Sequence, residues 1–167
     1  GLKTLEYRGY DSWGIATQNH KKIIIEKHLG KLPKKLPKSN ISNHKSGIGI
    51  GHTRWATHGG VTLLNTHPHL DCARQISVLH NGIIENYQEL KQELQAKNHV
   101  FKSETDTEVL AHLLEEYTKN DRLLDAMRKT FNRLHGLNAV VAVNANNKEI
   151  IAAKNGSPLV AGIDDNN

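Results

Sequence analysis

Apolar residues recur along this chain with two periods, and the first part of the sequence shows the period of β-strands. Trp13–Thr17 and Lys22–Glu26 read as two strands, and the polar turn between them predicts a hairpin. From Gly47 onward, the run GIGIGHT alternates glycine with isoleucine, which is typical of a closely packed strand. A further strand is predicted over Ile76–His80.

The helical period dominates the second half of the chain, where three helices are predicted. Their apolar faces hold Ile84, Tyr87, Leu90 and Leu94 in the first, Val109, Leu110, Leu113, Leu114 and Tyr117 in the second, and Leu124, Met127, Phe131 and Leu134 in the third. The third helix should span residues 121–134, with Gly136 where a C-terminal cap belongs. Short apolar runs at 138–144, 149–154 and 158–163 are predicted as closing strands.

Strands group with strands and helices with helices along this chain, and tight polar turns join the strands. This grouping favours an α+β fold with mostly antiparallel sheets over a doubly wound fold. A length of 167 residues fits one domain with its own core. Residues 60–74 keep no period and are expected to form a long loop, which in a compact domain tends to be functional or disordered.

The net charge of +5 is concentrated in one segment. Residues 19–47 hold eight lysines against the single acid Glu26, and no aromatic residue interrupts them; the lysines are Lys21, Lys22, Lys27, Lys31, Lys34, Lys35, Lys38 and Lys45. Such a run is usually a solvated face, so we expect no nucleic-acid binding, with a basic nucleic-acid-binding domain as the alternative.

Cysteine usage and hydropathy indicate the compartment. The single cysteine, Cys72, excludes an internal disulfide and fits a reducing compartment, so a cytoplasmic protein is predicted. No apolar run approaches membrane-spanning length, and the first residues are too charged for a signal peptide, so no membrane contact is expected. The chain opens inside a helix-like pattern without a capping residue, which suggests an absent upstream piece.

The segment HTRWATHG, residues 52–59, has the residue types of a ligand-binding loop and directly follows a predicted strand. Its arginine, Arg54, carries a planar guanidinium with five donors that fits a carboxylate bidentately. Arg54 is therefore a candidate anchor for a small acid.

The segment HNGIIENY, residues 80–87, has two interpretations. Asn-Gly at a strand end is typical of a type I′ hairpin turn. The helical pattern that follows favours instead a strand-to-helix corner, where the Asn81 amide and the Gly82 N–H can stabilise a developing oxyanion. Gly82 would also let a substrate approach the backbone closely.

The segment SETDTE, residues 103–108, opens the second predicted helix. Ser103 or Thr105 can act as its capping residue, and the acids can favour the positive end of the helix dipole. In the functional interpretation, Asp106 binds a cationic group of a ligand. Arg54 for a carboxylate and Asp106 for an ammonium would together recognise a free amino acid.

These motifs, with LEYRGYDSWGIA from Leu5 and the HPH of residues 67–69, occur in an order and spacing that resemble one family. The chain resembles the glutaminase domain of the glutamine:fructose-6-phosphate aminotransferases. The resemblance implies a four-layer αββα fold of the N-terminal-nucleophile type, shared by class II glutamine amidotransferases. It covers the sequence from its start to the second helix, and it implies that residues 1–167 are one glutaminase domain without a cofactor.

The resemblance assigns roles to individual residues. It implies that Arg54 holds the α-carboxylate of L-glutamine and Asp106 its α-ammonium, while Asn81 and Gly82 form the oxyanion hole. Further binding-loop positions are matched by Trp55, Thr57 and His58, and Arg8 matches an arginine close to the nucleophile.

In the family the nucleophile is an N-terminal cysteine, whereas residue 1 here is glycine. The internal Cys72 has no free α-amine beside it and is expected to be an incidental loop thiol. The sugar-isomerase domains that follow in the family, which bind fructose 6-phosphate, are also absent from the sequence. We therefore expect an inactive fragment, with any homo-oligomer formed through the absent domains.

Three alternatives remain open at this point. The chain could be the glutaminase domain of another class II amidotransferase, a non-catalytic glutamine-binding module, or the basic nucleic-acid-binding domain considered above. A metal site built from the eleven histidines is not expected, because their spacing in the motifs differs from that of zinc sites.

Overall fold

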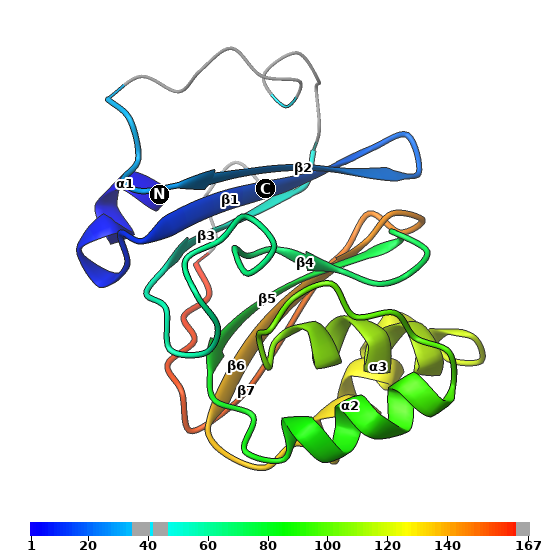
Figure 1. Cartoon of the computed structure of the whole chain (residues 1–167). Helices are drawn as coiled ribbons and strands as arrows, with labels where there is room; N and C mark the ends of the chain where they lie inside the picture. Colours follow the sequence, from blue (N-terminus) through cyan, green and yellow to red (C-terminus); the bar gives the residue numbers. More distant parts are fainter. Residues whose placement is uncertain (35–40, 42–46, 163–167) are drawn as a thin grey trace.

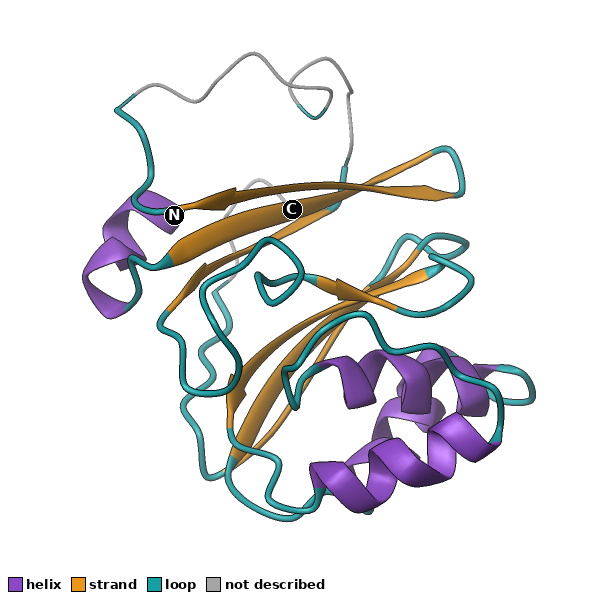
Figure 2. Cartoon of the chain, in the orientation of Figure 1, coloured by secondary structure: helices purple, strands orange, loops and turns teal. Residues whose placement is uncertain are grey.

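Two antiparallel sheets lie face to face, and helices cover the outer face of one of them, in the computed structural model of this chain (Figures 1 and 2). The structure describes residues 1–34, 41 and 47–162. The first sheet has the order β2-β1-β3 and the second the order β4-β5-β6-β7. Every strand pair is antiparallel, and the α+β fold class is confirmed.

The first sheet contains the predicted hairpin. Its strands are β1 (Ser12–Asn19), β2 (Lys22–Leu29) and β3 (Gly49–Arg54). The two-residue turn between β1 and β2 holds His20 and Lys21 at φ 43° and 62°. These left-handed angles match the right-handed twist of the two strands, which is why the short polar turn closes here.

The second sheet confirms most of the remaining strand predictions. Its strands are β4 (His69–Leu70), β5 (Ile76–Gly82), β6 (Asn138–Asn144) and β7 (Ile150–Asn155). The short β4 lies within the segment expected to be a loop. Residues 158–162 form no strand, so the strand predicted over 158–163 is wrong for its described part. Pro158 lacks an N–H for a ladder, and Val160 is 91% exposed.

The three predicted helices form beneath the second sheet, with the two short helices of the N-terminus elsewhere. The helices are α1 (Leu2–Leu5), the 3₁₀ helix η1 (Glu6–Arg8), α2 (Tyr87–Ala96), α3 (Glu108–Thr118) and α4 (Leu123–Phe131). The last is shorter than predicted and is capped at Asn132, so Gly136 is not its cap. Gly136 instead has φ +98° in the following loop, where a Cβ would lie 2.4 Å from the Ile83 carbonyl oxygen.

Along the stack, the layers run from the first sheet through the second sheet to the helices (Figure 2). These are three of the four layers of the expected αββα arrangement: two sheets and one layer of helices. On the first sheet, the described residues place α1 and η1 at one end rather than across the outer face (Figure 1). None of the helices in the described ranges is long and apolar enough to cross a membrane.

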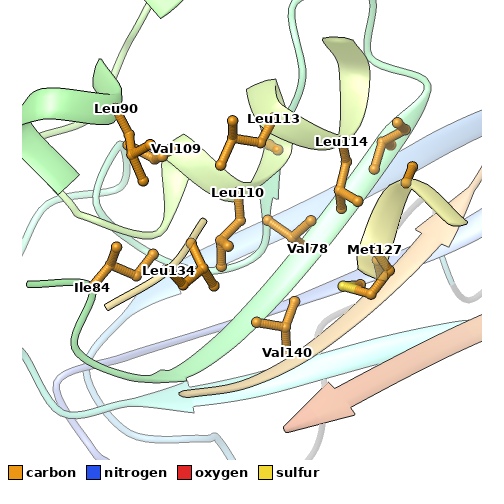
Figure 3. Close-up of a cluster of buried hydrophobic side chains, with 14 of the residues drawn as sticks. Val78, Ile84, Leu90, Val109, Leu110, Leu113, Leu114, Met127, Leu134 and Val140 are labelled. Carbon is orange, nitrogen blue, oxygen red and sulfur yellow. The ribbon is translucent and has the colours of Figure 1, made fainter. Parts of the chain in front are cut away.

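Two apolar clusters hold the layers together, and β5 contributes to both. Val78 lies in the larger cluster, between the second sheet and the helices, with Leu110, Leu134 and Val140 (Figure 3). Leu79 points the other way, into the smaller cluster between the sheets. Burial on both faces explains why the adjacent residues Val78 and Leu79 of β5 are both apolar.

The lysine-rich segment is only partly described. Lys35, Lys38 and Lys45 lie outside the described residues. Lys27 departs from the expected solvated face because it is half-buried on β2. Burial lowers its pKa to about 8, with Glu108 opposing and Arg74 adding to the change.

Leu110 is fully buried at the centre of the larger cluster. Replacing it in Leu110→Ala should lower the free energy of unfolding by roughly 2–5 kcal/mol, because the apolar contacts are lost and a cavity remains. Urea unfolding measures this. In the matched control Val160→Ala, at an exposed position, the change should stay below about 0.5 kcal/mol. Equal effects of the two substitutions would contradict this assignment of the core.

Candidate functional site

A cavity of about 300 Å³ is lined by the ends of β3 and β5. The two strands end on the same side of the molecule (Figure 1). The cavity gathers every residue proposed from the sequence to bind or process a ligand. These lining residues are Arg8, Arg54, Trp55, Thr57, His58, Asn81, Gly82 and Asp106. Four separate segments of the chain supply them, so the fold has brought together what the sequence left far apart.

Arg54 is the last residue of β3 and is buried. Its guanidinium donates through Nη1 to the Gly60 carbonyl at 3.2 Å and through Nη2 to the carbonyls of His58 and Gly59. The side chain therefore draws residues 58–60 into a compact loop around itself. Burial lowers its pKa, while Asp11 and Asp106 oppose the change.

Asp11 fixes the start of the same loop, a role the sequence did not reveal. Its amide donates to the Arg54 carbonyl at 3.0 Å, and its Oδ2 accepts from the Ala56 amide at 2.9 Å. Further along, Glu104 accepts from the Gly60 amide at 3.3 Å and from Asn65 at 2.9 Å. The loop is thus held at both ends by carboxylates of distant segments.

The aromatic residue of this loop lies at the surface. Trp55 is 59% exposed, and its ring lies 5.7 Å from that of Tyr10. On the opposite part of the loop, the His58 ring meets Tyr87 edge-on at 5.8 Å. An exposed indole at the cavity gives the site an apolar wall next to the Arg54 charge.

Asn81 and Gly82 end β5 and pair with Ala139 and Asn138 of β6. This pairing excludes the type I′ turn, because β5 does not fold back at Asn81. Gly82 has φ +145°, and a Cβ there would lie 2.1 Å from the Leu137 carbonyl oxygen. Only glycine fits this backbone.

Asp106 lies in the bend before α3 and is 4% exposed. Its Oδ2 accepts from the Ile84 amide at 2.8 Å, which ties it to the corner that follows Gly82. The capping interpretation of this motif is wrong, because Thr107 is the N-cap residue and its side chain makes no cap hydrogen bond. Ser103 instead donates to Glu108 at 2.7 Å.

A directional chain of hydrogen bonds runs beneath the cavity. Asn138 donates through Nδ2 to the Gly136 carbonyl at 2.9 Å, which turns its Oδ1 toward His80 Nε2, also at 2.9 Å. His80 must therefore donate from Nε2 and, when neutral, accept at Nδ1 from the Thr107 hydroxyl at 3.0 Å. The Thr107 oxygen then accepts from His67 Nε2 at 2.9 Å.

This chain needs neutral histidines, and the surroundings keep them neutral. Burial, followed by the neighbouring His52 and His69, lowers the pKa of His67 well below its ordinary value. Burial also lowers the pKa of His52 to about 4 and that of His69 to about 3. Among the described residues, His67 Nδ1 has no hydrogen-bond partner, as expected of a lone-pair nitrogen at the end of the chain.

Cys72 does not line the cavity. It follows β4, and its sulfur lies 3.6 Å from His112 Nδ1. Burial and the neighbouring Glu115 charge raise the pKa of the thiol, which disfavours the reactive thiolate.

Comparison with known sequences identifies the kind of domain that builds this cavity. Residues 62–167 match the profile of the glutamine amidotransferase domain. The glutamine–fructose-6-phosphate aminotransferase (isomerizing) of Pyrococcus horikoshii is 52% identical over 165 residues, covering 98% of this chain and 28% of that protein. The protein of the same name from Thermotoga maritima is 50% identical over 169 residues. The chain thus spans about 28% of the length of such relatives.

Solved structures share the fold. Glutamine phosphoribosylpyrophosphate amidotransferase from B. subtilis, complexed with ADP and GMP, superposes with a TM-score of 0.75 at 28% identity, over 92% of this chain and 33% of that one. A structure described as the allosteric regulatory enzyme of purine biosynthesis gives a TM-score of 0.77 at 29% identity. Both support the N-terminal-nucleophile fold expected from the motifs.

The pH dependence of stability reports on the buried histidines. The pKa of His69 is about 3 in the folded protein, mainly because of burial, against about 6.5 when unfolded. The unfolded chain therefore takes up a proton that the folded chain refuses, and stability falls as the pH drops below about 6.5. This one group should lower the free energy of unfolding by roughly 1.4 kcal/mol per pH unit between about pH 6 and 4.

In His69→Gln that contribution should disappear, so urea unfolding from pH 7 to pH 4.5 should show a shallower slope than the unchanged protein. Glutamine retains a polar group for the Thr105 hydroxyl, which now lies 3.1 Å from His69 Nε2. The matched control is His135→Gln, at an exposed position, where the original slope should persist. An unchanged slope in His69→Gln would show that folding does not lower the pKa of His69.

Proposed function

The chain belongs to the glutamine amidotransferase domain family, and we propose that its cavity binds L-glutamine and stabilises attack on the side-chain amide. The observation that carries this proposal is the joint presence of Arg54, Asp106 and the Asn81–Gly82 corner in one cavity. A cation, an anion and a pair of N–H donors are what the carboxylate, the ammonium and the reacting amide of one glutamine molecule require.

In this proposal Arg54 binds the α-carboxylate. Three loop carbonyls accept from Nη1 and Nη2. A guanidinium has five N–H donors in a fixed plane, so donors remain for a ligand after the loop is satisfied. The partly desolvated charge also strengthens its attraction for an anion.

Asp106 binds the α-ammonium in the same proposal. Its Oδ2 accepts from the Ile84 amide at 2.8 Å. The carboxylate is thereby held in one orientation before a ligand arrives, which reduces the entropy lost on binding. Trp55, Thr57 and His58 complete the wall around the amino acid group.

Asn81 and Gly82 supply the oxyanion hole in the proposed reaction. A nucleophile adds to the amide carbon, the oxygen takes the negative charge, and the Asn81 amide and Gly82 N–H donate to it. The C–N bond then breaks, the leaving nitrogen takes a proton as ammonia, and water releases glutamate from the acylated nucleophile. No cysteine lines the cavity in the described part of the chain; the family resemblance assigns the attack to an N-terminal cysteine with Arg8 near it.

For the whole protein we propose the reaction named for its relatives. Residues 1–167 would act as the glutaminase domain, and the ammonia would convert fructose 6-phosphate to glucosamine 6-phosphate on other domains without a cofactor. Support comes from relatives about 50% identical to this chain. The proposal includes homo-oligomerisation through those other domains and no role for nucleic acid. The single cysteine supports a reducing compartment such as the cytoplasm.

Asp106→Asn tests the ammonium contact. Asparagine keeps an oxygen for the Ile84 amide but loses the charge, so kcat/KM for glutamine should fall about 10- to 100-fold, in line with the loss of a charged hydrogen bond. Glutamate release by the protein at its natural length measures this. The matched control Asp125→Asn makes the same change on the exposed side of α4 and should leave kcat/KM unaltered. Unchanged glutamine use in Asp106→Asn would refute the contact.

Asn81→Ala tests the oxyanion hole separately from binding. The side-chain donor acts on charge that develops only during the reaction, so kcat should fall about 10²- to 10³-fold. KM for glutamine should stay close to its original value, as determined in the same assay. A rise in KM with unchanged kcat would place Asn81 in ground-state binding instead.

A further inference from the structure

Four potential metal ligands converge on the side of the helical layer, away from the cavity. One ligand atom from each of Cys72, His99, His112 and Glu115 lies within 4.8 Å of the others. Cys72 follows β4, His99 lies between α2 and α3, and the other two lie one turn apart on α3. Three segments thus bring sulfur, nitrogen and oxygen donors to one point.

The separations of the ligand atoms lie within about 0.5 Å of those expected around a tetrahedral zinc ion. Cys72 Sγ lies 3.6 Å from His112 Nδ1 and 3.9 Å from His99 Nδ1. Glu115 Oε2 lies 3.3 Å and 2.9 Å from the same two nitrogens. Ordinary zinc bond lengths at tetrahedral angles place sulfur and nitrogen about 3.6 Å apart and nitrogen and oxygen about 3.4 Å apart.

A carboxylate lies behind each imidazole, on the side away from the shared point. His99 Nε2 is hydrogen-bonded to Glu116 Oε2 at 3.1 Å, whereas His112 Nε2 lies 3.7 Å from Glu108 Oε1 and makes no hydrogen bond to a described residue. When a metal ion binds at Nδ1, a carboxylate at Nε2 can hold the ring proton on that nitrogen. Metal-binding histidines characteristically have such a carboxylate behind the ring.

The other two ligands are also held in place. Glu115 accepts from the amides of Cys72 and Ala73, both at 3.1 Å. The Val100 amide donates to the Cys72 sulfur at 3.3 Å, which stabilises negative charge on it. Cys72 is exposed whereas the two histidines are buried, so a metal ion can reach the ligands from solvent.

We propose that Cys72, His99, His112 and Glu115 bind a structural zinc ion. A thiolate and two imidazoles favour zinc over calcium or magnesium, which prefer oxygen ligands. The thiolate and the carboxylate together balance the charge of the ion. Four protein ligands leave no open coordination position, which is typical of a structural site. The ion would fix the turn after β4 and the segment after α2 to α3.

Metal titration of the chelator-treated protein at its natural length tests this site. The unchanged protein should bind one equivalent of Zn²⁺ more than Cys72→Ser, and its melting temperature should rise with Zn²⁺ more than that of the variant. Co²⁺ should give the intense d–d bands of a tetrahedral site with a thiolate-to-metal charge-transfer band, and Cys72→Ser should lose that band. Circular dichroism and melting with chelator present should show that the metal-free variant is folded.

Two further variants separate this site from other histidines. Glu116→Gln removes the carboxylate behind His99 and should weaken Zn²⁺ binding roughly 10- to 100-fold while the charge-transfer band remains. The matched control His20→Asn, in the exposed turn between β1 and β2, should bind Zn²⁺ like the unchanged protein. Equal Zn²⁺ stoichiometry in Cys72→Ser and the unchanged protein, or a Co²⁺ complex without a thiolate band, would overturn the proposal.

Discussion

The cavity depends on the two hydrogen bonds that join the Thr107 hydroxyl to His67 and His80. The hydroxyl lies at the start of α3 and connects that helix to β5 and to the loop before β4. The carboxamide of Asn138 extends the connection to β6. Because each hydroxyl or ring donates in one direction only, the elements around the cavity are fixed relative to one another. Asp106 and Gly82 take their positions from this frame, each next to one of its members.

The pattern of apolar and polar residues was enough to predict most strands and helices. It did not predict the chain of hydrogen bonds beneath the cavity. The hairpin, β5, β6 and the three longer helices follow from side-chain period and turn residues. The run at 158–163 also had the right pattern, yet the described residues 158–162 find no partner strand. Gly136 looked like a helix cap, but close approach to the Ile83 carbonyl explains its conformation better.

The candidate site shows the same limit. Arg54, Asn81 and Asp106 were singled out by residue type, and only the resemblance to a family said that they meet. Thr107 escaped notice because the helix start offered Ser103 and Thr105 as capping residues, and nothing local marks Thr107. Its actual partners, His67 and His80, are distant in sequence, so only tertiary structure reveals the bond. Likewise, the partners of Cys72 come from elements that the sequence alone does not bring together.

Arg54 combines two tasks that are usually divided between residues. Its guanidinium shapes the loop through three carbonyls and, in the proposed function, also recognises the carboxylate of the substrate. A lysine offers three donors from a single atom and cannot span both tasks. Evolution of this cavity toward a ligand without a carboxylate would therefore meet an obstacle at Arg54, since the residue would stay under selection for loop shape. New specificity would have to arise at the other walls of the cavity, around a fixed positive charge.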